Sequence, residues 1–374
     1  MQKIGAIAQL VEHLHGMQRV GGSNPPSSTI YLLNMNIADK FSRKLRDVRI
    51  SVTDRCNFRC TYCMPKEVYD ANYKFFKKTE ILSFEEIIRL VKILASLGVK
   101  KVRLTGGEPL LRKNTHVLVK HIKKIKGITD ISMTTNGVLL SEKNALLLKE
   151  SGLNRLTISL DSIDPIRFQE ISGTNYHPND VLSGIHNAKK VGFENIKINM
   201  VVKKDINHED ILPMLDKFSD TGCIVRFIEF MDVGNVNFWE KKDVISLKEI
   251  LSIISNKYHV KSLEKNYSSE VAKRWSYSGG EFGIISSISN PFCGDCSRIR
   301  LTAEGKLFTC LFADKSHDIK KLVRSSESDE IIKNYLINMW KVRDDKYSET
   351  RMSQNGLQNI KKAEIGIKFF LGHI

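Results

Sequence analysis

From about residue 47 the chain alternates between short β-branched runs and longer stretches whose apolar positions recur with helical spacing. This alternation is typical of parallel strands joined by crossover helices. It therefore predicts six β/α units. The predicted strands are 48–52, 101–104, 130–134, 155–159, 196–202 and 223–230, and the predicted helices are 84–97, 115–124, 141–151, 179–191 and 208–218.

Six β/α units suit either a partial (βα)6 barrel or an open doubly wound sheet, and periodicity alone does not separate them. Both architectures place active sites at the carboxyl ends of the strands. The segments that follow the strands are therefore the informative ones. In chain order they are a cysteine-rich loop, a Gly-Gly pair, Thr-Thr-Asn-Gly and Ser-Leu-Asp.

The rhythm of strands and helices fades after residue 232, so we expect one domain over 41–232 and a C-terminal region over 233–374. Residues 1–40 differ from both, because the string Gly-Gly-Ser-Asn-Pro-Pro-Ser-Ser at 21–28 cannot continue a regular element. They resemble neither a secretory signal nor a transit peptide. The N-terminal segment resembles the translation of a transfer-RNA gene, and we expect it to be a disordered or artefactual extension.

Composition narrows the class of protein without choosing a function. The chain is 41% hydrophobic and 27% charged, as in soluble globular proteins. No apolar run approaches the roughly 18 residues needed to cross a bilayer, so we expect a cytoplasmic protein without a membrane partner. The excess of 58 Lys and Arg over 42 Asp and Glu gives a charge of +16. That charge favours polyanions, either nucleotides, phosphates or nucleic acid.

Six of the seven cysteines fall into two groups of three. A disulfide framework belongs to short secreted chains, so reduced thiolates that bind metal fit these groups better. The seventh, Cys223, lies in an apolar stretch and is expected in the core. The first trio is Cys56, Cys60 and Cys63, and the second trio is Cys293, Cys296 and Cys310.

The first trio has the spacing Cys-x3-Cys-x2-Cys, so one loop supplies three thiolates. A structural zinc site and a fully ligated four-iron cluster each need four ligands, and three would leave one iron with an open position. The alternative for either trio is a zinc site completed by a histidine. His317 could complete the second.

Tyr62 before the third cysteine and Gly-Gly-Glu-Pro at 106–109 complete a pattern that resembles the radical S-adenosylmethionine (SAM) superfamily. The resemblance implies an α/β fold, a partial (βα)6 TIM-type barrel closed by a C-terminal cluster-binding region. It also implies a 4Fe-4S cluster on the first trio. The SAM contacts that it implies are Tyr62, Gly107, Ser159 and Met231.

Taken together, segments 51–65, 103–109, 134–137, 159–161, 226–231 and 293–300 resemble the GTP 3′,8-cyclase family of molybdenum-cofactor biosynthesis. The resemblance implies that a 5′-deoxyadenosyl radical removes the 3′ hydrogen of GTP and that the carbon radical attacks guanine C8, giving a cyclised dihydro-GTP. The resemblance also implies that no side chain acts as an acid or base. A second 4Fe-4S cluster on the second trio would bind guanine. The implied GTP contacts are Arg49, Arg103, Thr134, Lys197, Arg298 and Arg300.

The same resemblance implies cyclic pyranopterin monophosphate synthase as the downstream enzyme and a flavodoxin or ferredoxin as reductant. It implies no nucleic-acid partner, and a homodimer stays open. The alternatives are a peptide-modifying radical enzyme with auxiliary clusters and a zinc-stabilised nucleic-acid-binding protein. The family ends in two glycines, where Phe369 and Phe370 stand here. We expect this difference to weaken cyclisation but to spare radical formation.

Overall fold

The computed structural model describes residues 36–232, 239–313 and 315–353. These residues belong to one compact unit that begins at Asn34. Their strands form a single twelve-stranded sheet in the order β12-β11-β10-β1-β2-β3-β4-β5-β6-β9-β8-β7. Residues 1–35 of the expected N-terminal extension, and Phe369 and Phe370, lie outside the described residues. Residues 36–40 of that extension are ordered, because Ile37 packs into the core and Asp39 forms buried ion pairs, so the expectation of disorder is wrong for them.

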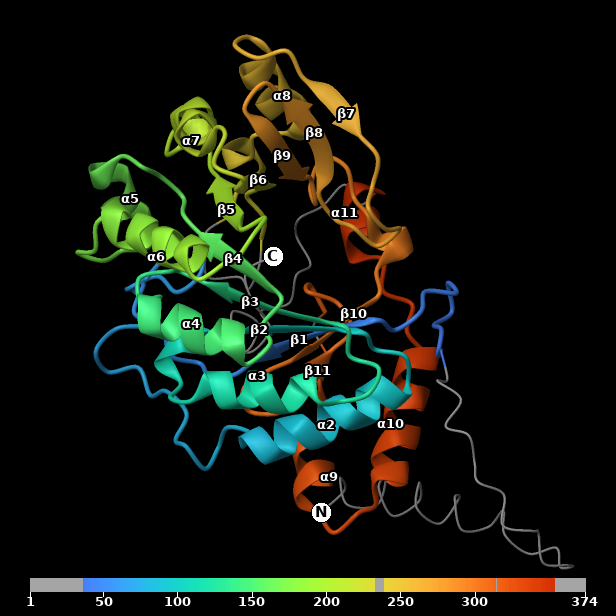
Figure 1. The fold of residues 1–374 in the computed structure, drawn as a ribbon. Coiled ribbons are helices and arrows are strands. Elements are labelled where there is room, and N and C mark those ends of the chain that lie inside the picture. Colours follow the sequence, from blue (N-terminus) through green and yellow to red (C-terminus); the bar gives the residue numbers. More distant parts are fainter. Residues whose placement is uncertain (1–35, 233–238, 314, 354–374) are drawn as a thin grey trace, which may run out of the picture. The chain divides into compact units, whose positions relative to one another are not determined.

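Six parallel strands form the centre of the sheet and pair in the order of the sequence. Since crossovers are right-handed, this order places all the crossover helices on one face, as in a barrel; a doubly wound sheet would place helices on both faces. The predicted partial barrel is therefore confirmed (Figure 1). The strands are β1 (Asp47–Ser51), β2 (Lys101–Thr105), β3 (Asp130–Thr135), β4 (Arg155–Ser159), β5 (Lys197–Val202) and β6 (Ile224–Glu229).

The crossover helices match the predicted ones, with one addition and one shortened start. The addition is α5 (Pro165–Ser172), a short helix that begins with proline after the N-cap Asp164. The last predicted helix begins at Ile211 because His208–Asp210 is a 3-10 turn. The other helices are α2 (Phe84–Ser96), α3 (Thr115–Lys123), α4 (Glu142–Glu150), α6 (Pro178–Lys190) and α7 (Ile211–Phe218).

Helix α2 illustrates why these segments fold locally. Ser83 and Glu86 form a reciprocal capping box that satisfies two backbone N–H groups at its start. Ile87, Leu90 and Leu94 follow at helical spacing and are each 1% exposed. Burying three such side chains contributes several kcal/mol, at about 1.5–3 kcal/mol each.

The chain after residue 238 extends the same sheet at both edges. At one edge β9 (Gly280–Ile285) runs parallel to β6, and at the other β10 (Arg298–Leu301) runs parallel to β1. The sheet is therefore continuous across the expected boundary at 232. The remaining elements are β7 (Lys261–Leu263), β8 (Lys273–Tyr277), β11 (Lys306–Phe308), β12 (His317–Asp318), α8 (Leu247–Ser255), α9 (Lys320–Arg324), α10 (Asp329–Lys341) and α11 (Tyr347–Ser353).

Among the described residues, no helix has both the length and the apolar character needed to cross a bilayer.

Candidate active site

The barrel strands carry apolar residues on one face and polar residues on the other. On β1, for example, Val48 and Ile50 belong to the core under the helices, so Arg49 between them points into the barrel. The same alternation repeats on the neighbouring strands and collects polar groups inside. The inward polar positions are Arg49, Arg103, Ser132, Thr134, Thr157, Ser159, Lys197, Asn199, Arg226, Arg298 and Arg300.

The two cysteine trios lie at opposite ends of the parallel strands, the first at the carboxyl ends and the second at the amino ends. The first trio follows the carboxyl end of β1, whereas Cys293 and Cys296 precede β10, which runs parallel to β1. Cys310 follows β11, which runs antiparallel to β10 and so returns the chain to the amino ends of the parallel strands. A five-residue strand spans roughly 16 Å, at about 3.3 Å per residue. The polar interior therefore lies between two cysteine sites.

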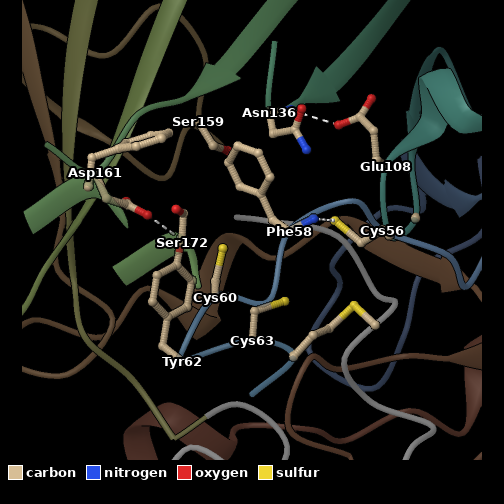
Figure 2. A pocket seen from close by; sticks show the side chains of 14 residues that line it. Cys56, Phe58, Cys60, Tyr62, Cys63, Glu108, Asn136, Ser159, Asp161 and Ser172 are labelled. Atoms are coloured by element: carbon tan, nitrogen blue, oxygen red, sulfur yellow. Dashed lines mark hydrogen bonds between the residues drawn. The ribbon is translucent and has the colours of Figure 1, made fainter. Parts of the chain in front are cut away.

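The first pocket contains the first trio and three of the four predicted SAM contacts. Its lining includes Cys56, Cys60, Cys63, Tyr62, Gly107 and Ser159. Figure 2 shows the cysteine side chains between Tyr62 with Asp161 on one side and Glu108 with Asn136 on the other. The hydroxyl of Ser159 is buried without a hydrogen-bond partner. It is thus free to bind a polar ligand group in this pocket.

Glycine is required where the Gly-Gly segment passes the cysteine loop. A Cβ on Gly107 would lie 2.2 Å from the carbonyl oxygen of Arg55, and Gly106 has a φ of +145°. Two backbone hydrogen bonds form at this close approach. The Gly107 N–H donates to Thr53 O at 2.9 Å, and the Glu108 N–H donates to Arg55 O at 2.8 Å. The pair therefore holds the cysteine loop against β2 as well as lining the pocket.

Glu108, which lines the first pocket, ties the ends of β2 and β3 together. Its Oε1 accepts from Thr135 Oγ1 at 2.8 Å, and its Oε2 accepts from the Asn136 N–H at 2.7 Å. Burial raises the pKa of this carboxyl to about 7, despite these hydrogen bonds. Since both oxygens already accept hydrogen bonds, the carboxylate stiffens the rim of the first pocket.

Tyr62 is fixed by a partner that the sequence did not indicate. Its hydroxyl donates to Asp161 Oδ2 at 2.6 Å, and Asp161 Oδ1 accepts from the Val201 N–H at 2.8 Å. Burial raises the pKa of Asp161 to about 6, against the lowering effect of the Tyr62 hydrogen bond. This contact joins the cysteine loop to the ends of β4 and β5.

The thiols of the first trio fit a cationic group. Burial raises the pKa of Cys56 to about 12 and also raises the pKa of Cys60 and Cys63. Thiolates in such a place need positive charge nearby, which iron ions supply. Among the described residues, no three His, Cys, Asp or Glu side chains gather closely enough to hold a single metal ion. The three thiols instead stand around a shared pocket.

The second pocket combines the second trio with three arginines. Arg49, Arg298 and Arg300 line it beside Cys293, Cys296 and Cys310. The arginines are 4–7% exposed, and five of their side-chain nitrogens are buried without a hydrogen-bond partner: Nε of Arg298, and Nε and Nη1 of both Arg49 and Arg300. Unpaired buried donors are costly. An anion between them would satisfy these donors.

Electrostatics indicate that this cationic group is incompletely neutralised. Burial, then Arg103, Arg300 and Arg298, hold the pKa of Arg49 well below its usual range. Burial and Arg298 similarly lower the pKa of Arg300 to about 10. Repulsion between like charges destabilises the protonated forms. A bound polyphosphate would relieve that repulsion.

The basic interior continues along β5 and β6. Burial, then Arg226, Arg155 and Arg103, lower the pKa of Lys197 to about 7. Arg226 donates from Nε to Asn199 Oδ1 at 2.9 Å, and burial together with Arg103 lowers its pKa to about 9. Arg226 was not predicted as a substrate contact. Its inward position between the apolar Val225 and Phe227 is the signal that could have found it.

The structure separates the predicted contacts into three groups. Two groups line the two pockets, as described above. A third group, Arg103, Thr134, Lys197 and Met231, lines neither pocket. The first three lie at inward strand positions between them, and the Thr134 hydroxyl is buried without a partner. Met231 is 4% exposed and packs in an apolar cluster with Ile228 and Ile285.

Two family descriptions cover most of the chain. The radical SAM superfamily matches residues 50–218, and Molybdenum Cofactor Synthesis C matches residues 223–349. Relatives named GTP 3′,8-cyclase include those of Staphylococcus haemolyticus, at 44% identity, and Staphylococcus aureus, at 43%. Each alignment covers 90% of this chain and 99% of the relative.

Solved structures share the fold at low sequence identity. Streptococcus suis SuiB bound to S-adenosylmethionine has a TM-score of 0.58 at 15% identity, over 88% of this chain and 73% of SuiB. The anSMEcpe structure with bound AdoMet has a TM-score of 0.51 at 17% identity, over 79% and 84%.

A partial barrel with a three-cysteine loop at the carboxyl end of its first strand defines a radical SAM protein. Such proteins use SAM and iron–sulfur clusters. Because residues 223–349 match a second family description and the curated relatives share 43–44% identity over 90% of the chain, the chain belongs to the GTP 3′,8-cyclase family of molybdenum-cofactor biosynthesis.

Proposed function

We propose that this chain is a GTP 3′,8-cyclase whose substrate lies inside the barrel between the two cysteine trios. The observation that carries the proposal is the second pocket, where three thiols and three buried arginines with unpartnered nitrogens share one lining. A triphosphate carries several negative charges, and guanidinium groups bind phosphate oxygens bidentately. A base and a triphosphate therefore both find suitable partners there.

We propose that each trio holds one 4Fe-4S cluster, and that the cluster of the first trio with SAM supplies the 5′-deoxyadenosyl radical. In the first pocket Tyr62, Gly107 and Ser159 would contact SAM. Met231 is the one predicted SAM contact that does not line the first pocket, so it has the least support of the four.

The residues of this chain contribute by binding and orienting the substrate. Arg49, Arg298 and Arg300 would hold the nucleotide at the second pocket, while Arg103, Lys197 and Arg226 place further positive charge along the interior. Thr134 offers a free buried hydroxyl between the pockets. Holding the ribose near the radical source in fixed orientation accelerates the reaction without acid–base chemistry.

The family's pathway suggests the partners. We propose that the product passes to cyclic pyranopterin monophosphate synthase and that a flavodoxin or ferredoxin supplies electrons. A homodimer and a cytoplasmic location remain expectations for this chain.

The test is an anaerobic assay of the reconstituted protein with GTP, SAM and a reductant. Formation of 5′-deoxyadenosine together with a cyclised dihydro-GTP supports the proposal. Cys60→Ala should abolish both products, whereas Cys223→Ala, which changes a buried cysteine outside both pockets, should retain them. Colourless protein that holds zinc and forms neither product would instead favour the nucleic-acid-binding alternative.

A further inference from the structure

Two arginines from distant parts of the chain meet on one buried carboxylate beside the second trio. Arg43 Nε lies 2.7 Å from Asp39 Oδ2, and Arg343 Nη1 lies 2.9 Å from the same oxygen. The three side chains are 2%, 0% and 1% exposed, respectively for Arg43, Asp39 and Arg343. Desolvation makes such buried pairs expensive unless further hydrogen bonds compensate.

The further hydrogen bonds go to the backbone of the loop that carries Cys293 and Cys296. Arg43 Nη1 donates to Cys293 O at 2.9 Å, and Arg343 Nη1 donates to Cys296 O at 2.9 Å. Each arginine therefore holds one cysteine of the Cys-x2-Cys pair. The loop between them is a single 3-10 turn, Cys293–Asp295, without a side-chain cap of its own. Its geometry depends on donors from outside.

The arginines are themselves held from the other side. Trp340, which is fully buried, donates from Nε1 to Arg43 O at 3.0 Å, and the Arg343 guanidinium lies 4.6 Å from the centre of its ring. The backbone carbonyl of Asp345 accepts a hydrogen bond from Arg43 Nη1 at 2.8 Å, and its carboxylate pairs with Arg343 Nε at 3.2 Å. The two guanidinium groups are thus restrained in both position and orientation.

Arg343 also brings a positive charge close to the second trio. Its guanidinium donates directly to the backbone carbonyl of Cys296 at 2.9 Å, and its side chain is 1% exposed, so water screens this charge little. A positive charge near an iron–sulfur cluster stabilises the reduced form, which carries one more negative charge. Net charge and outer hydrogen bonds are among the factors that set cluster potentials.

We propose that Asp39, Arg43 and Arg343 form a positioning triad that fixes the backbone of Cys293 and Cys296 and raises the reduction potential of the cluster they hold. Arg343 supplies the charge, while Asp39 and Arg43 keep it in place. The inference rests on the proposed function only for the presence of that cluster.

The experiment isolates the second cluster in a Cys56→Ala/Cys60→Ala/Cys63→Ala background and measures its midpoint potential by a redox titration followed with electron paramagnetic resonance. Arg343→Gln should lower the potential, with a ten-fold change in the reduction equilibrium corresponding to about 59 mV for one electron. Arg343→Lys keeps the positive charge, but a single ammonium cannot bond Asp39, Asp345 and the Cys296 carbonyl at once as the guanidinium does. It should keep the potential and lose iron to a chelator several-fold faster.

The matched control is Arg89→Gln. Arg89 also joins one carboxylate and two backbone carbonyls, Asp329 Oδ1 at 2.7 Å, Val323 O at 2.8 Å and Glu327 O at 2.6 Å, but it lines neither pocket. It should leave both the potential and the rate of iron loss unchanged.

An unchanged potential in Arg343→Gln, or an equal shift in Arg89→Gln, overturns the proposal. If Arg343→Gln loses its fold by circular dichroism, Arg343→Lys decides: faster iron loss at normal potential supports the triad, and loss of fold in both assigns these residues to the scaffold alone. A background protein with no cluster signal would count against the proposed function, which separates that failure from failure of the triad.

Discussion

Arg300 of β10 lies in register with Arg49 of β1, and Arg103 of β2 continues the same row across a third parallel strand. Like charges side by side on a sheet repel each other. Here they are also buried, and the pKa of Arg49 and of Arg300 falls accordingly. The ligand-free barrel is therefore prepared for an anion at the expense of its own stability.

Removing one arginine of the second pocket should weaken GTP binding. Arg298→Ala and Arg300→Ala should each cost about 1.5–3 kcal/mol, because a charge-assisted hydrogen bond to phosphate is lost. Isothermal titration calorimetry under anaerobic conditions measures the change, and SAM affinity should stay the same. Arg167→Ala serves as the control, because it removes an arginine of α5 that pairs with Asp210 outside both pockets. Equal GTP affinity in the parent and both pocket variants would contradict the assignment.

GTP binding should take up a proton through Lys197. The pKa of its ammonium is about 7 in the ligand-free protein, so at pH 8 the group is mostly neutral, and a nearby triphosphate favours the charged form. The binding enthalpy at pH 8 should therefore depend on the ionisation enthalpy of the buffer. At pH 6 Lys197 is already protonated, and this dependence should shrink.

Lys197→Met should remove most of the buffer dependence at pH 8, whereas Lys190→Met, at an exposed lysine paired with Glu142, should not. If the Lys197→Met protein takes up as many protons as the parent, other groups are responsible.

The Tyr62 and Asp161 contact should stabilise the fold more at high pH than at low pH. The pKa of Asp161 is about 6 in the folded protein, above its usual value, so the carboxylate is charged, and most in need of its donor, above pH 6. Tyr62→Phe should lower the free energy of unfolding by about 1.5–3 kcal/mol at pH 8 and by less at pH 5. Denaturant titrations at both values measure it.

Tyr258→Phe provides the comparison, because Tyr258 also donates to an aspartate, Asp216, but at the exposed surface. That change should cost less at pH 8. A loss for Tyr62→Phe that is the same at pH 5 and pH 8 would show that the hydrogen bond to the ionised carboxylate is not its cause.

Iron analysis should give about eight irons per chain after anaerobic reconstitution, since each trio is expected to hold one four-iron cluster. Cys60→Ala and Cys296→Ala should each retain about four, and Cys223→Ala about eight. In addition, Cys296→Ala should still bind SAM, because the first pocket is intact. About four irons and one zinc in the parent would mean that the second trio is a zinc site.

The sequence was sufficient for features that depend on local pattern. The alternation on β1 to β6 predicted each strand to within one residue, since buried apolar positions with period two have no competing interpretation there. Cysteine spacing identified both trios. Arg298 and Arg300 stand two residues apart on β10, so both face one side of the sheet and line the same pocket.

Contacts between distant segments were not predictable in this way. Nothing near Tyr62 in the sequence points to Asp161, and nothing near Cys296 points to Arg343, because these pairs form only when separate elements pack together. The position of the second trio was missed for the same reason. The rule that sites lie at the carboxyl ends of strands describes the first pocket. Parallel pairing of β10 with β1 instead places Cys293 and Cys296 at the amino ends of the strands.

That pairing also constrains the order in which the protein folds during synthesis. One side of β1 can pair with β2 early, but its other side has no partner until residues 298–301 have been made. A strand with an open edge is a template for association with other chains, and contacts so distant in sequence form slowly. The nascent protein therefore spends most of its synthesis with an unprotected barrel edge. Expression at low temperature, or with chaperones that cover exposed strands, should improve the yield of protein able to accept the second cluster.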